Sequence, residues 1–297
     1  MDSDIFYTFI RQPIVVTSFV ITVLMVLAAI FAPLLAPQNP FNPSELRLMD
    51  AFAPPGTEAI SGEMVYRLGA DGQGRDVFSA ILYGSRISLL VGVSSVLFAM
   101  ILGTGLGLYA GYRGGWPDAV IMRIVDVQLT FPSILVALLI FGVVSNVMPA
   151  GDRAQAALVV LVVSIGLSDW VHYARTVRGA TMVEKTKEYV QAGHVIGLPA
   201  RTILARHVLP NVMRPVLVIA TIGLALAIIA EATLSFLGVG MPPTQPSLGT
   251  LIRVGQDYMF SGEWWITFFP SLALLALALS VNLLGDWLRD VLNPKLR

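Results

Sequence analysis

The sequence predicts an all-α integral membrane protein with six transmembrane helices and both termini in the cytoplasm. Of its 297 residues, 56% are hydrophobic and only 13% are charged, whereas an average soluble chain has about 25% charged residues. Long stretches carry no charge, and a bilayer core of about 30 Å needs about 20 apolar residues in one helix. These stretches are continuously apolar rather than alternating, which favours helices over a β-barrel.

The uncharged stretches give the helices in chain order. We expect the first at residues 14–36, because its apolar run exceeds the roughly 7–15 residues of a cleaved signal peptide, which is the alternative. The fourth is short and must continue through Asp169 and Trp170, and the fifth contains Glu231 as its one charge. The last five helices are expected at residues 87–112, 127–149, 154–173, 212–237 and 264–285.

The basic residues indicate the orientation. An even number of crossings puts both termini on one side, and placing them inside leaves 13 Lys and Arg residues in the cytoplasm against six outside. Cytoplasmic loops of membrane proteins carry such an excess of Lys and Arg. The formal net charge is zero, so the position of the charges carries the information and their sum does not.

The predicted spans divide the chain into four parts. Residues 1–83 hold the first helix and a Pro-rich external segment, 84–288 form a core with five helices, 174–211 are a cytoplasmic loop within that core, and 289–297 are a cytoplasmic tail. In the external segment, the apolar spacing from Val77 to Leu82 predicts a short interfacial helix. The preceding Gly72-x-Gly74 lacks the Gly-Lys-Ser/Thr ending of a phosphate loop, which favours a plain turn.

The cytoplasmic loop is strongly basic, with seven basic and two acidic residues between Ala174 and Arg214. One helical pattern begins at Glu188 and stops at Gly197 and Pro199, and a second runs from Ala200 to Leu209-Pro210. We predict a helix-turn-helix hairpin. The alternative is a basic loop lying on anionic headgroups, which would not require these glycines and prolines.

This hairpin resembles the cytoplasmic loop of bacterial ABC importer permeases. Gln191-Ala192-Gly193-x-x-x-Gly197, followed by His207-Val208-Leu209-Pro210, is similar to the family's Glu-Ala-Ala-x-x-x-Gly and Ile-x-Leu-Pro pattern. It departs from that pattern at Gln191, Gly193 and His207. Residues 68–77, 83–89, 188–192, 206–211 and 231–238 resemble the C-subunit of the dipeptide/oligopeptide/nickel subfamily, and the likeness covers nearly the whole chain.

The resemblance implies a type I ABC importer transmembrane fold and a non-catalytic subunit that forms half of a pathway for dipeptides or related oligopeptides. It implies the bacterial inner membrane as location. The implied partners are a second homologous permease subunit in a heterodimer, two cytosolic ABC ATPase subunits and a periplasmic peptide-binding protein, besides membrane lipid and without nucleic acid. No cofactor is expected on this chain, because ATP and Mg would bind to the ATPases.

An ion-coupled secondary transporter is the alternative function. Such proteins normally show inverted repeats and several intramembrane ionisable residues, whereas this chain has one such acid and no clear repeat. An intramembrane enzyme is disfavoured, because the sequence has no Cys and no His-Glu-x-x-His motif, and its three histidines fall at or beyond the cytoplasmic end of the fourth span. The three histidines are spaced by 22 and 13 residues, which matches no short metal-ligand signature.

Two groups of candidate site residues follow. Glu231 is expected near the outer end of its span as a gate, an interhelical hydrogen-bond partner or a neutral acid, because burying a charge is costly. Gly103, Gly107 and Gly111 recur on one helix face, which favours close packing either within the chain or against the partner permease. The resemblance assigns contact with the ATPase to Glu188, Tyr189, Ala192, Gly193, Gly197, Leu209 and Pro210.

Overall fold

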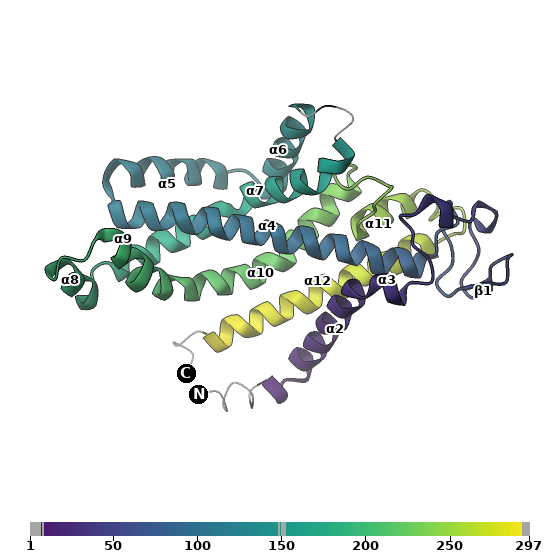
Figure 1. Ribbon diagram of the computed structural model, residues 1–297, viewed down its shortest axis with the longest axis horizontal. Coiled ribbons are helices and arrows are strands. Elements are labelled where there is room, and N and C mark those ends of the chain that lie inside the picture. Colours follow the sequence, from purple (N-terminus) through teal and green to yellow (C-terminus); the bar gives the residue numbers. More distant parts are fainter. Residues whose placement is uncertain (1–6, 8, 148, 150–152, 293–297) are drawn as a thin grey trace.

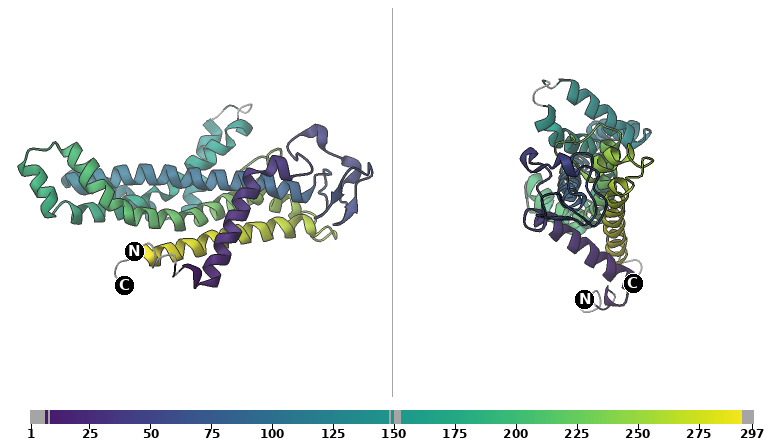
Figure 2. Two further views of the ribbon diagram at one scale, coloured as in Figure 1. Left: turned by 60° about the horizontal axis from the view of Figure 1, so that its bottom comes forward. Right: turned by 90° about the vertical axis from the view of Figure 1, so that its right-hand side faces the viewer.

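A computed structural model describes residues 7, 9–147, 149 and 153–292. Within them, five helices are long and apolar enough to cross a membrane. They extend along the long axis of the molecule, with α4, α7 and α10 packed together and α2 crossing α12 at an angle (Figures 1 and 2). These helices are α2 (Pro13–Ile30), α4 (Val77–Arg113), α7 (Arg153–Glu184), α10 (Leu209–Phe236) and α12 (Trp265–Leu292).

The third expected span, at residues 127–149, is built differently from the expectation. The chain is already helical in α5 (Gly115–Leu129), then bends by 101° before α6 (Ser133–Val147). The two helices are long and apolar enough to cross a membrane only when they are taken together. Pro132 explains the break, because a proline disfavours helical geometry in the residue before it. Residues 148 and 150–152 lie outside the described residues, so the end of this span does too.

Three other helices are longer than the sequence suggested. The short interfacial helix expected from Val77 is the first part of α4, which Asp76 caps by accepting a hydrogen bond from the Ser79 N–H at 2.8 Å. The span expected to end at residue 173 continues in α7 to Glu184, and α12 continues past residue 285. Arg86 and Arg175, which limited the expected spans, lie inside these helices because neither residue breaks a helix.

The first helix is shorter than the expected residues 14–36. α2 ends at Ile30, and after Phe31 the short helix α3 (Ala32–Leu35) follows. At the other end of α2, the Phe9 ring lies edge-on to Trp287 of α12, with 5.3 Å between the ring centroids. The beginning of the described chain and the end of α12 therefore lie together, as an even number of crossings requires.

The external segment and α11 (Leu248–Gln256) lie at the end of the molecule opposite the hairpin (Figure 1). Two strands pair in antiparallel fashion, with Thr57 opposite Tyr66, around a small core that contains the buried Tyr66. The Ser247 hydroxyl caps α11 by accepting a hydrogen bond from the Thr250 N–H at 3.3 Å. The other elements here are η1 (Pro43–Glu45), η2 (Leu48–Asp50), β1 (Thr57–Glu58) and β2 (Val65–Tyr66).

Candidate functional site

The hairpin forms one end of the molecule (Figure 1). Helix α8 (Glu188–Val195) ends in a turn at Gly197, whose φ of +79° favours glycine. The chain then forms α9 (Ala200–Ile203) and η3 (Leu204–Val208), which has π-helical geometry and leads directly into α10. The second helical pattern was expected to stop at Pro210. It continues instead through the π-helical η3 into α10, where Pro210 is the second residue.

The inner face of the hairpin is apolar and includes Gly193. Val190 and Gly193 are buried, and a Cβ atom added to Gly193 would lie 3.5 Å from Ile203 and 3.7 Å from Leu198. Gly193 therefore shapes the hairpin from inside and offers no surface to a partner. Of the other residues assigned to ATPase contact, Leu209 is half-buried, and those exposed are Glu188, Tyr189, Ala192, Gly197 and Pro210.

Tyr189 ties α8 to the helices on either side of it. Its hydroxyl donates a hydrogen bond to Glu184 at the end of α7 and accepts one from the Asn211 side chain of α10 at 3.0 Å. Partial desolvation of the Tyr189 hydroxyl, followed by its hydrogen bond to Glu184, raises the pKa of this group. These two bonds connect α8 to both α7 and α10.

Two exposed apolar residues at the end of α8 were missed in the sequence. Val195 is 87% exposed and Ile196 is 73% exposed. They stand directly before Gly197, in the hairpin that forms one end of the molecule (Figure 1). Their exposure could have been predicted from the sequence, because the two apolar residues stand beside a helix-ending glycine in a polar loop.

The three spaced glycines bring α4 against α7 of the same chain. A Cβ atom added to Gly103 would lie closer than 3.0 Å to the Trp170 carbonyl oxygen, and one added to Gly107 equally close to that of Ala174. At Gly111 the same atom would be 2.7 Å from the Arg178 carbonyl oxygen. Of the two alternatives that the sequence left open, the described contacts are those within the chain.

Glu231 lies near the end of α10 and is fully buried. Its two carboxyl oxygens accept hydrogen bonds from the hydroxyls of Ser88 and Ser235, each at 2.7 Å. The Ser88 hydroxyl also accepts a bond from the Leu248 N–H at 3.3 Å, in the first turn of α11. Glu231 is thus the centre of a polar junction that joins α4, α10 and α11.

A cavity of about 910 Å³ opens between α4, α6, α7 and α10. Ligand pockets typically have volumes of about 300–1,000 Å³. Its walls are mostly apolar, but Asp169, His172, Tyr173 and Thr176 line it from one face of α7, and Ser95 lines it from α4. The sequence did not indicate this site, because Asp169 was expected near a membrane border. The extension of α7 to Glu184 places Asp169 near the middle of the helix.

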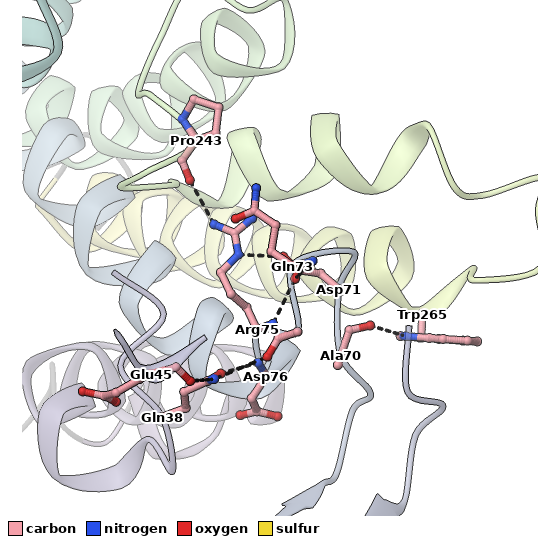
Figure 3. Close-up of polar contacts among 10 residues, drawn as sticks. Gln38, Glu45, Ala70, Asp71, Gln73, Arg75, Asp76, Pro243 and Trp265 are labelled. Atoms are coloured by element: carbon pink, nitrogen blue, oxygen red, sulfur yellow. Dashed lines mark hydrogen bonds and ion pairs between the residues drawn. The ribbon is translucent and has the colours of Figure 1, made fainter. Parts of the chain in front are cut away.

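A buried polar cluster at the opposite end fastens the external segment to the rest of the chain (Figure 3). The Arg75 guanidinium donates to the Asp71 carboxylate at 2.7 Å and to the Pro243 carbonyl at 2.9 Å. The Trp265 indole N–H of α12 donates to the Ala70 carbonyl at 3.1 Å. These bonds attach the turn at residues 70–75 both to the loop before α11 and to α12, so the three parts form one surface.

The comparison with known families decides the identity. Over residues 103–297 the chain matches the family described as binding-protein-dependent transport system inner membrane component. Over residues 3–55 it matches the N-terminal TM domain of oligopeptide transport permease C. The chain belongs to the binding-protein-dependent transport permeases.

Characterised relatives match this permease over almost its whole length. It is 38% identical to the dipeptide transport system permease protein DppC of Escherichia coli, over 99% of this chain and 93% of the relative. It is equally similar to DppC of Haemophilus influenzae, over 92% and 88%. The glutathione transport system permease protein GsiD of Pectobacterium atrosepticum is 37% identical over 97% and 89%.

Solved structures show that the permease has the type I ABC importer transmembrane fold. It matches a crystal form of the MetNI methionine ABC transporter in inward-facing conformations with a TM-score of 0.54 and 21% identity. This match covers 73% of the permease and 97% of the solved chain. An amino acid ABC transporter matches with a TM-score of 0.50 and 12% identity, over 70% and 92%. Fold and family together favour an ABC permease over the ion-coupled secondary transporter.

Proposed function

We propose that this permease is the membrane-spanning subunit of an ATP-driven importer for dipeptides or related oligopeptides in the bacterial inner membrane. The observation that carries the proposal is the family match, together with relatives at 36–38% identity that are named for dipeptide or di/tripeptide transport. A second, homologous permease subunit supplies the other half of the pathway. The large cavity between α4, α6, α7 and α10 is this chain's contribution.

The hairpin couples the pathway to two cytosolic ATPase subunits. ATP and Mg bind to those subunits, so this chain is non-catalytic and carries no cofactor. The support is mechanical: α9, η3 and α10 form a continuous helical path from the hairpin to the cavity wall. When ATP closes the ATPase dimer, displacement of α8 moves α10 and alters the cavity, because packed helices shift between discrete arrangements as rigid elements.

A periplasmic peptide-binding protein delivers the substrate at the opposite end. The support is the bonded cluster around Arg75, which makes the external segment, the loop before α11 and the start of α12 a single body (Figure 3). A partner that binds this surface can act on α12 and, through α11, on α10. Selection among peptides is then shared between the binding protein and the cavity.

The coupling role is tested by Val195→Asp. The complete transporter is purified through a tag on this chain, and the retained ATPase subunits are quantified by mass spectrometry. Because the exposed Val195 side chain is expected to lie in an apolar contact, a buried unpaired carboxylate should reduce ATPase retention at least about tenfold. Val65→Asp is the matched control, since Val65 is also exposed but lies in β2 at the opposite end.

The two variants give a clear decision. Loss of the ATPases from Val195→Asp, with full retention by Val65→Asp, supports the hairpin as their binding site. Equal retention by both variants would contradict that assignment. A wild-type chain that retains no ATPase at all would contradict the proposed function as a whole.

A further inference from the structure

We propose that the cavity holds the free amino terminus of the transported peptide, with the Asp169 carboxylate as its counter-ion and the hydroxyls of Tyr173 and Ser95 as additional hydrogen-bond partners. The proposal rests on the proposed function and deepens it, since it assigns part of substrate recognition to the permease itself. The ligand group is a primary ammonium. Three features of the cavity lead to it: an unpaired acid, two unpartnered hydroxyls and apolar walls.

The first feature is the carboxylate. Asp118 and Asp126 of α5 each face an arginine of α7, namely Arg178 and Arg175. Asp169 has no ion-pair partner within the described part of the chain, and its one side-chain hydrogen bond is a long one of 3.3 Å from the neighbouring Ser168. A half-buried acid on the wall of a mostly apolar cavity is costly without a cation. A ligand ammonium supplies that cation.

The second feature is the pair of hydroxyls. Ser95 is 1% exposed and Tyr173 is 2% exposed, and neither hydroxyl has a hydrogen-bond partner among the described residues. Both residues line the same cavity as Asp169, and Tyr173 follows Asp169 by one helical turn. Gly223 leaves room for the phenol, because a Cβ atom there would lie 2.8 Å from the Tyr173 hydroxyl oxygen. Buried polar groups normally find partners, and an ammonium with three N–H donors can satisfy several acceptors at once.

The third feature is the balance of charge and apolar surface. The other ionisable groups that face the cavity are His172, Arg175 and Tyr173, and Arg175 is already paired with Asp126. Among the described residues the cavity therefore has one carboxylate, that of Asp169, with no ion-pair partner. Its remaining walls, including Ala99, Ile134 and Leu226, are apolar, which strengthens a charge-assisted hydrogen bond and accommodates varied peptide side chains.

The test measures ligand binding to the purified transporter complex without its binding protein, so that recognition by that partner cannot contribute. Thermal stabilisation is recorded against millimolar alanyl-alanine and N-acetyl-alanyl-alanine, which differ in the positive charge of the amino terminus. The variants are Asp169→Asn, Asp169→Glu and Tyr173→Phe. Asp286→Asn is the matched control, because Asp286 is an exposed carboxylate on α12 that does not line the cavity.

We expect the wild-type complex and Asp286→Asn to prefer the free dipeptide at least about tenfold in apparent affinity. Asp169→Asn should lose this preference with an unchanged melting temperature in the absence of peptide, Asp169→Glu should regain part of it, and Tyr173→Phe should weaken binding several-fold. A preference that persists in Asp169→Asn overturns the proposal while leaving the importer function intact. Failure of any peptide to stabilise the wild-type complex, together with absence of ATP-driven uptake, would instead count against the proposed function.

Discussion

Gly103, Gly107 and Gly111 hold α4 at backbone contact with α7, and this spacing is sensitive to a single methyl group. Gly107→Ala would push a Cβ atom against the Ala174 carbonyl oxygen, whereas Gly105→Ala in the same helix meets open space. We expect Gly107→Ala to lower the stability of the purified permease by about 1–3 kcal/mol through overpacking. Gly105→Ala should be neutral or slightly stabilising, by up to about 1 kcal/mol. Thermal unfolding of the two variants measures the difference, and equal midpoints would contradict close packing here.

At the scale of single residues, the sequence identified several important positions, but it did not identify the residues that they contact. The spacing of the three glycines predicted a close helix contact, and the partner helix needed the three-dimensional structure. Gly193 belongs to the sequence motif of the hairpin, but the motif does not show that Gly193 lies on the buried face of α8. Asp169 was expected near a membrane border, and its place on the wall of a cavity was not visible in the sequence.

At the scale of elements, the buried Glu231 fastens α11 to the core. Replacing it with Leu removes the acceptors for Ser88 and Ser235 and weakens the junction that also holds the Leu248 N–H. We expect faster amide hydrogen exchange in residues 248–256 in Glu231→Leu, because local opening costs less free energy. Glu231→Gln keeps one acceptor oxygen and should stay close to the wild type. Unchanged exchange in Glu231→Leu would rule out this anchoring role.

The existence of the long helices was predictable from apolar length, and most of their limits were not. Charges served as borders in the sequence, but Arg86 and Arg175 lie inside helices that are longer than a bilayer requires. The break at Pro132 carries a local signal, while the 101° bend depends on how α5 and α6 pack against α4 and α7. Similarly, Pro210 was read as a stop because its place at the start of a longer helix depends on η3 before it.

At the scale of the whole molecule, the proposed partners bind at opposite ends and the cavity lies between them. The hairpin reaches the cavity through α10, and the external surface reaches it through α11 and α12. In this arrangement, each of two distant partners can shift the equilibrium between two conformations of the same cavity. The sequence predicted a basic cytoplasmic hairpin and a Pro-rich external segment, and the family resemblance implied a partner for each. The cavity is lined by several helices that are far apart in the sequence, so it was found only in three dimensions.

The central claim is that ATP drives transport through this permease. The complete transporter is reconstituted in vesicles with its binding protein outside and its ATPases facing the lumen, and uptake of labelled alanyl-alanine is measured. Uptake should require ATP in the lumen, stop with a non-hydrolysable analogue and ignore imposed proton or sodium gradients. Uptake that follows a gradient in vesicles without ATP would contradict the account and identify an ion-coupled transporter.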